Sequence, residues 1–187
     1  ALGEAVAEPA MIPELVNRAS GKDPAMRRLV VKVLGRFDVP QARKALEHAL
    51  HDADKGVRQA ALAALVERGV SVDLALLCGL LRDPDLGIQE QAVDAVIRRH
   101  DPDTITHLLP VLRDESEYAR RAGVEVLNSI GSTRDVKLLL NSVKDEDWWV
   151  RARAADALAR IGGPRVVRAV VELLRDEDNA GLRNTTA

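Results

Sequence analysis

The sequence contains very few aromatic residues. Only 2% of its 187 residues are Phe, Tyr or Trp, and they occupy four positions: Phe37, Tyr118, Trp148 and Trp149. Large rings fill much of the volume of most protein cores, so this chain must build its core from aliphatic side chains. Because 47% of the residues are nevertheless hydrophobic and 30% are charged, the composition is that of a folded protein.

Other features are also scarce, and each scarcity argues against a class of protein. The single cysteine, Cys78, cannot form an internal disulfide, which fits a reducing compartment. No apolar run approaches the roughly 20 residues that span a bilayer, and no signal-peptide pattern opens the chain. The net charge of −2 lacks the basic excess that nucleic acids or anionic membranes attract. We therefore predict a cytoplasmic protein that binds neither nucleic acid nor membrane.

What the sequence does contain is a repeat with a period of 31 residues. The stretch at 145–162, DEDWWVRARAADALARIG, has counterparts at regular steps toward the N-terminus, with no insertion between them. A fixed period of this length is typical of repeat arrays, in which each unit buries its apolar face against its neighbours. The full repeats occupy 21–51, 52–82, 83–113, 114–144 and 145–175, and partial repeats occupy 1–20 and 176–187.

Each full repeat predicts two antiparallel helices. In the repeat at 52–82, Asp54 stands at an N-cap position, and the apolar residues after it recur at helical spacing. After a short loop, a second helix presents a buried face of four leucines: Leu74, Leu77, Leu80 and Leu81. The sequence therefore predicts an all-α protein, an α-solenoid that forms a single array over 1–187. Since both ends of the array are open, we expect a segment of a longer protein, or self-association through the ends.

The motif D-x-D-x-x-V-R-x-x-A-A-x-A-L-x-x-I-G is most complete at 145–162. With the second short helix, it resembles the HEAT-like repeat of the phycobilin-lyase (E-Z, PBS lyase) type over nearly the whole chain. The resemblance implies a right-handed superhelix whose first helices line the concave side. It also implies a ladder of ion pairs between stacked repeats, formed by the first Asp and the Arg of the motif. The residues at these positions are Asp52 and Arg58, Asp114 and Arg120, and Asp145 and Arg151.

Two repeats depart from this motif. Gly21 stands where the first Asp is expected, and Gln89 stands where the Arg is expected. Since each change removes one charge from the implied ladder, we expect the ladder to be weaker at those joints.

A cluster of aromatic residues marks the candidate site. In the resembled family, the two residues before the Val-Arg pair point into the concave groove, and Tyr118, Trp148 and Trp149 fall on these positions in adjacent repeats. Exposed aromatic side chains are enriched among binding hot spots, so we expect a protein partner there. The alternative is that one tryptophan packs under a neighbouring loop as part of the core. The expected polar rim consists of Arg121, Glu125, Arg153 and Asp156.

The sequence offers little for catalysis. His48 and His51 lie three residues apart, but no Cys or paired carboxylate completes a metal site. Cys78 takes a position that is apolar in other repeats and is interpreted as a packed thiol. No Gly-rich phosphate loop occurs. We therefore predict no catalytic residue, no metal, no cofactor and no enzyme activity.

Three functions from different classes fit these observations. The first is a non-catalytic scaffold or adaptor that binds a protein partner in the groove. The second follows the resembled family: a chromophore lyase or isomerase subunit, whose bound bilin would absorb visible light. The third is a nucleic-acid binder of the HEAT-like DNA-repair kind, which needs a basic concave face. The acidic residues of the expected groove argue against this third function: Glu90, Asp94, Glu117, Glu125 and Asp156.

Overall fold

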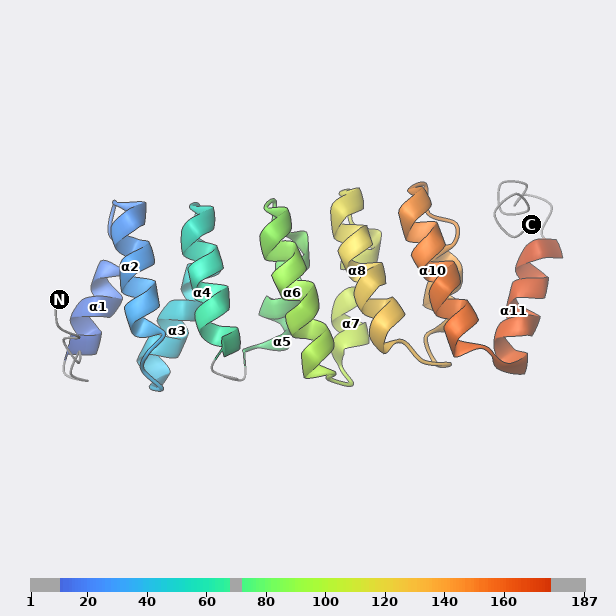
Figure 1. Ribbon diagram of the computed structural model, residues 1–187, viewed down its shortest axis with the longest axis horizontal. Helices are drawn as coiled ribbons and strands as arrows, with labels where there is room; N and C mark the ends of the chain where they lie inside the picture. The colour runs from blue at the N-terminus through green and yellow to red at the C-terminus, as the bar shows by residue number, and fades with distance from the viewer. Residues whose placement is uncertain (1–10, 68–71, 176–187) are drawn as a thin grey trace. The chain divides into compact units, whose positions relative to one another are not determined.

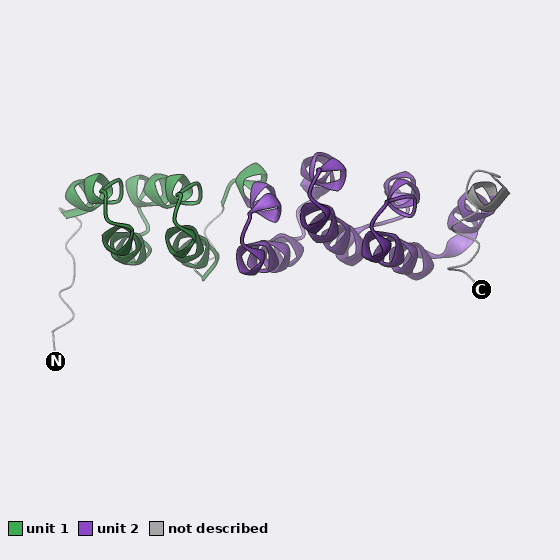
Figure 2. Cartoon of the chain, turned by 90° about the horizontal axis from the view of Figure 1, so that it is seen from above, with its two compact units in different colours: residues 1–76 green, residues 77–187 purple. Residues whose placement is uncertain are grey.

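The computed structural model describes residues 11–67 and 72–175 of the chain. These residues form helices joined by short turns and loops, with no strand among them (Figure 1), which confirms the prediction of an all-α fold. Within those ranges, none of the helices has the length and apolar character of a membrane span. The helices belong to two compact units, residues 1–76 and 77–187 (Figure 2).

Unit 1 contains two layers of helices in its described part. Its helices are α1 (Ile12–Arg18), α2 (Pro24–Leu34), α3 (Pro40–Ala49) and α4 (Lys55–Glu67), and α5 (Leu74–Gly79) begins in this unit. Helices α2 and α4, the first helices of their repeats, form one layer, and α1 and α3, which are second helices, form the other (Figure 2).

Unit 2 follows the same plan. Its elements are η2 (Leu80–Arg82), α6 (Leu86–Arg99), α7 (Thr104–Leu108), η3 (Val111–Arg113), α8 (Glu117–Ile130), α9 (Val136–Ser142), α10 (Trp148–Ile161) and α11 (Gly163–Arg175). The first helices α6, α8 and α10 have 14 residues each and lie side by side (Figure 1). The second helix of repeat 83–113 is split into α7 and η3 at Pro110, which has no backbone N–H to donate. Each full repeat is a helix pair, and the chain is an α-solenoid.

The two aspartates of the D-x-D motif have separate tasks at the start of each first helix. The carboxylate of Asp145 accepts the backbone N–H of Asp147 at 2.9 Å, and the carboxylate of Asp147 accepts the N–H of Val150 at 3.0 Å. The first bond closes the turn and the second caps the helix. Ser116 takes the capping position of α8 without a side-chain cap bond. The same pair of bonds recurs at Asp52 and Asp54 and at Asp83 and Asp85.

The core is aliphatic, as the composition predicts. None of the four aromatic residues is fully buried, and the largest fully buried side chains are Leu, Ile and Val. Small residues recur at one position of the first helices, where Ala61, Ala92 and Ala154 are fully buried and Gly123 takes the place of alanine. A Cβ on Gly123 would lie 3.1 Å from Cγ1 of Val111. Close helix packing therefore compensates for the absence of large rings.

The implied ladder has a specific geometry around Arg120. This side chain is buried, and its Nε and Nη2 donate to the carboxylate of Asp145 in the next repeat at 2.9 and 3.1 Å. Its Nη1 donates to the backbone carbonyls of Asp114 and Glu115 in its own repeat at 2.9 and 3.0 Å. The ion pair thus runs from the Arg of one repeat to the Asp of the next, while the contact within a repeat is made to the backbone.

The same geometry recurs in unit 1. Arg27 donates from Nε and Nη2 to Asp52 at 2.7 and 2.6 Å, and from Nη1 to the carbonyl of Gly21 at 3.0 Å. Because the bond within the repeat needs only a carbonyl, glycine can replace aspartate there. Arg58 in unit 1 and Arg151 in unit 2 likewise donate from Nη1 to the carbonyls of Asp52 and Asp145, at 2.8 and 2.9 Å.

The departure at Gln89 is compensated by another residue. Arg82, from η2, forms an ion pair with Asp114, the acidic partner that an Arg at position 89 would serve. The Arg82 side chain is 51% exposed, whereas that of Arg120 is 8% exposed. Since solvent weakens exposed ion pairs, this joint gains less from its ion pair than the joint between Arg120 and Asp145.

We predict that Arg120→Ala lowers the free energy of unfolding by about 3 kcal/mol, because it removes a guanidinium that is only 8% exposed, together with its bonds to Asp145 and to two backbone carbonyls. Urea titration followed by far-UV circular dichroism measures this loss. The matched control is Arg82→Ala, for which we expect a loss of about 0.5 kcal/mol, since the Arg82 side chain is 51% exposed. Equal losses in the two variants would contradict this interpretation.

Candidate functional site

Unit 2 has a depression of about 430 Å³ between its first helices. Helix α6 contributes Leu86, Gln89, Glu90, Val93 and Asp94 to its lining. Leu86, the first residue of α6, is 50% exposed, and Val93 is nearly buried. This wall therefore combines apolar surface with carboxylates and one amide.

The opposite wall comes from α8 and the start of α10. Four of the residues predicted as partner-binding line the depression here: Tyr118, Arg121, Glu125 and Trp149. The other three, Trp148, Arg153 and Asp156, are not among its lining residues. The structure thus brings together the centre of the predicted site and leaves part of its rim outside.

The two tryptophans have different surroundings although they are adjacent in the chain. Trp148, the first residue of α10, is 65% exposed. Trp149 is half-buried, and the guanidinium of Arg153 lies 5.6 Å from the centre of its ring. Tyr118 is 47% exposed and has the guanidinium of Arg121 5.4 Å from its ring centre. Both rings of the depression are therefore held against an arginine through cation–π contacts.

Each of these arginines also links α8 to α10. Arg121 donates from Nε and Nη2 to Asp147, the cap of α10, at 3.0 and 2.6 Å. In the other direction, Arg153 of α10 donates two bonds of 2.7 Å to Glu125 of α8. Three of the four residues predicted as a polar rim, Arg121, Glu125 and Arg153, therefore form ion pairs between the two helices, and these ion pairs lie beside Tyr118 and Trp149.

The ion pair with Arg121 shifts the pKa of Asp147 strongly. The hydrogen bond from Arg121, followed by those from the backbone N–H groups of Val150 and Trp149, lowers the pKa of this carboxyl from 3.8 to about 2. These bonds stabilise the charged form and outweigh burial, which acts in the opposite direction. In return, the pKa of Arg121 is raised, chiefly by its bond to Asp147.

Sequence reasoning placed Glu90 and Asp94 of α6 in the expected groove but did not include Leu86 and Gln89 in the site. Leu86 stands at the repeat position of Trp148, and Gln89 is the residue that departs from the Arg of the motif. Both signals are visible in the repeat alignment. What they did not reveal is that the two residues line the same depression as Tyr118.

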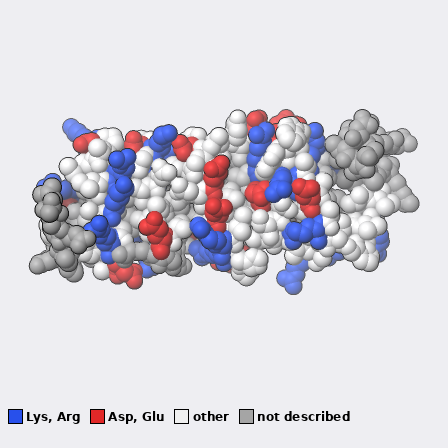
Figure 3. Space-filling model, viewed as in Figure 1, with Lys and Arg blue, Asp and Glu red and all other residues white. Residues whose placement is uncertain are grey.

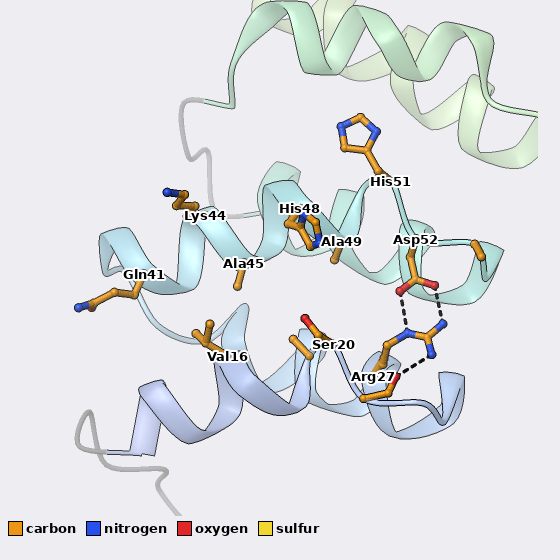
Figure 4. A pocket seen from close by; sticks show the side chains of 13 residues that line it. Val16, Ser20, Arg27, Gln41, Lys44, Ala45, His48, Ala49, His51 and Asp52 are labelled. Atoms are coloured by element: carbon orange, nitrogen blue, oxygen red, sulfur yellow. Dashed lines mark hydrogen bonds and ion pairs between the residues drawn. The ribbon is translucent and has the colours of Figure 1, made fainter.

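A second depression, of about 620 Å³, lies in unit 1 and is lined by residues of α1 and α3 (Figure 4). His48, His51 and Lys44 lie along it, and Arg27 at its edge is bonded to Asp52. In the described part of the chain, no group of three or more His, Cys, Asp or Glu residues could hold a metal ion. Cys78 is buried.

The fold and the ion pairs between repeats define a helical-repeat protein of the α-solenoid class. A family model of HEAT repeats matches residues 12–97 and 105–187. The chain therefore belongs to the HEAT-repeat family. The match does not extend to the narrower phycobilin-lyase type, so that part of the resemblance is not confirmed.

Among the solved structures similar to this chain are crystal structures of three engineered proteins, each 20% identical to it. The first has a TM-score of 0.47, and the match covers 86% of this chain and 84% of the other. The second has a TM-score of 0.48, and the match covers 87% of this chain and 51% of the other. The third has a TM-score of 0.49, and the match covers 86% of each chain. No curated protein matches the sequence.

We predict that the contribution of Asp147 to stability depends on pH. Because its pKa is about 2 in the folded state and 3.8 ordinarily, the contribution is fully present above about pH 4 and is lost as the pH falls toward 2. The stability difference between wild type and Asp147→Asn should therefore shrink over this range. Asparagine also caps helices well, so the change removes mainly the charge. Urea midpoints measured at several pH values test this.

Arg121→Ala should reduce the same pH dependence, because Arg121 is the main cause of the lowered pKa. A stability difference between wild type and Asp147→Asn that stays constant down to pH 2 would show that the Arg121 bond does not hold the carboxylate in the charged form.

Proposed function

We propose that this chain is a non-catalytic scaffold or adaptor that binds a partner protein at the depression of unit 2. The observation that carries the proposal is the exposed apolar surface of Tyr118 and Leu86 around a concave site, with Trp149 in its wall. Exposed apolar surface gathered at a depression is a feature of interaction sites. Aromatic side chains contribute much binding energy when a partner covers them.

The ion pairs around the depression support this proposal. A side chain that is already ordered loses less conformational entropy when a partner covers it. Tyr118 and Trp149 each lie against an arginine that is fixed by two hydrogen bonds to a neighbouring helix. The site is therefore pre-organised, and covering it costs little further ordering.

The chemistry of the surface favours a protein over a nucleic acid or a membrane. The wall from α6 carries the exposed carboxylates of Glu90 and Asp94. In Figure 3, acidic residues form a stripe over α6, and charges of both signs alternate over α8 and α10. Phosphate groups would be repelled by the acidic stripe, whereas a protein can present complementary charges.

We predict that Tyr118→Ala and Trp149→Ala each weaken the binding of the partner by at least about tenfold, as expected for hot-spot residues. The measurement is an affinity pull-down from extract of the source cells, with quantitative mass spectrometry of the retained proteins. The visible absorbance of the same eluate tests the bilin hypothesis, because a retained pigment would colour it.

Two further variants make this experiment specific. Leu29→Ala removes an apolar side chain that is 56% exposed in unit 1 and should leave capture unchanged. Trp148→Ala removes a ring outside the lining of the depression and should have a smaller effect than Trp149→Ala. If folded Tyr118→Ala and Trp149→Ala proteins retain the same partners as wild type, the depression is not the binding site.

A further inference from the structure

Gln89 is the least expected residue in the lining of the unit 2 depression. Only 7% of the residue is exposed, and its side-chain amide makes no hydrogen bond to another described residue. The amide is not among the fully buried polar groups that lack a partner, so water reaches it in the depression. Gln89 stands at the repeat position that Arg120 takes in the next repeat, and its side chain is shorter and neutral. Arg82 makes the ion pair to Asp114 in its place. An amide donor and acceptor therefore remain available in the depression.

Glu90 and Asp94 lie beside this amide, and both are exposed. Neither carboxylate has an ion-pair partner in the part of the chain that the structure describes. They are four residues apart on α6, so they lie on the same face of the helix. Figure 3 shows a stripe of acidic residues over α6. Like charges at this spacing repel each other, and a cation between them would remove that repulsion.

The other charges of the depression are already compensated. Arg121 is bonded to Asp147, and Glu125 is bonded to Arg153. The charges left without a partner in the lining are therefore the two carboxylates of Glu90 and Asp94. Apolar surface from Leu86, Val93 and Tyr118 completes the site.

We propose that the depression receives a cationic side chain, arginine or lysine, from a peptide segment of the partner protein. This inference rests on the proposed function and specifies the chemistry of the partner. The aliphatic stem of the side chain packs on Leu86, Val93 and Tyr118, as long basic side chains do on apolar surfaces. The charged head meets the carboxylates of Glu90 and Asp94, and the Gln89 amide bonds to the head or to the peptide backbone.

Charge complementarity is the argument for this occupant. An acidic site with an apolar wall matches both parts of a basic side chain, whereas a purely apolar occupant would leave the Gln89 amide and both carboxylates unpaired. A second copy of this chain also carries basic surface, since Arg28 and Lys32 are exposed on α2. The depression is concave and suits a single inserted side chain better than the convex face of a helix.

The test uses two fluorescein-labelled peptides of alternating Leu, Gly and Arg, identical except that one has citrulline in place of every arginine. Citrulline keeps the shape of arginine and lacks its charge. Fluorescence anisotropy with the full chain should show that the arginine peptide binds at least about tenfold more tightly than the citrulline peptide. Its binding should also weaken as the salt concentration rises.

Three variants locate the binding. The double variant Glu90→Gln with Asp94→Asn should weaken the arginine peptide by about tenfold or more. Its matched control, Glu47→Gln with Glu67→Gln, changes the net charge equally in unit 1 and should leave binding unchanged. Gln89→Arg restores the residue of the motif, so the protein should fold, while the added charge should abolish binding of the arginine peptide.

The remaining outcomes separate this inference from the proposed function. Equal binding of both peptides, lost in Tyr118→Ala, would overturn the cationic occupant and leave docking at the depression intact. Failure of the arginine peptide to bind wild type would overturn the inference, and the pull-down with Tyr118→Ala would still decide the proposed function. Dimers in analytical ultracentrifugation that disappear in the Glu90→Gln, Asp94→Asn variant would replace the peptide with a second copy as the occupant.

Discussion

The hydrogen-bonded ion pair between consecutive repeats is the interaction on which the rest of the described structure depends. Arg120 bonds to the backbone of the turn that opens its own helix and to the aspartate that opens the next first helix. That aspartate, Asp145, also accepts the backbone N–H that closes its own turn. One side chain therefore links the start of one first helix to the start of the next, and Tyr118 and Trp149 are the second residues of these two helices.

A second set of ion pairs lies further along the same two helices. Arg121 reaches from α8 to the cap of α10, and Arg153 reaches back from α10 to Glu125. The two sets together hold α8 and α10 through charged groups as well as through the aliphatic core. Since hydrogen bonds from charged side chains are directional, this arrangement controls how the helices are rotated, and so determines which face of each ring remains open.

The helix pairs could be predicted from sequence because they depend on local patterns. Asp54 and Asp147 cap their helices as the D-x-D motif predicts, and the leucines of the second helices follow helical spacing. The surroundings of Trp148 and Trp149 could not be predicted in this way. Neighbouring residues on a helix point about 100° apart. Which of the two contacts the next helix therefore depends on the rotation of α10 about its axis, and the repeat pattern of the sequence does not predict this rotation.

The pairing of the charged residues was equally inaccessible from sequence. Arg121, Glu125 and Arg153 have the composition of a solvated rim, and only the distance between α8 and α10 makes them partners. The compensation of Gln89 by Arg82 has the same origin, because Arg82 belongs to a different element of the repeat. Sequence patterns thus predict which helices form. Which charged groups remain exposed on each surface depends on the contacts that side chains make between helices.

The glutamine at position 89 affects where along the array a partner can bind. A perfectly periodic surface offers any partner several equivalent places, and the partner could shift by a whole repeat without penalty. Gln89 makes one repeat different from its neighbours while Arg82 preserves the joint to the next. Because the other full repeats hold arginine at this position, a partner that contacts the Gln89 amide can bind the array in one register only.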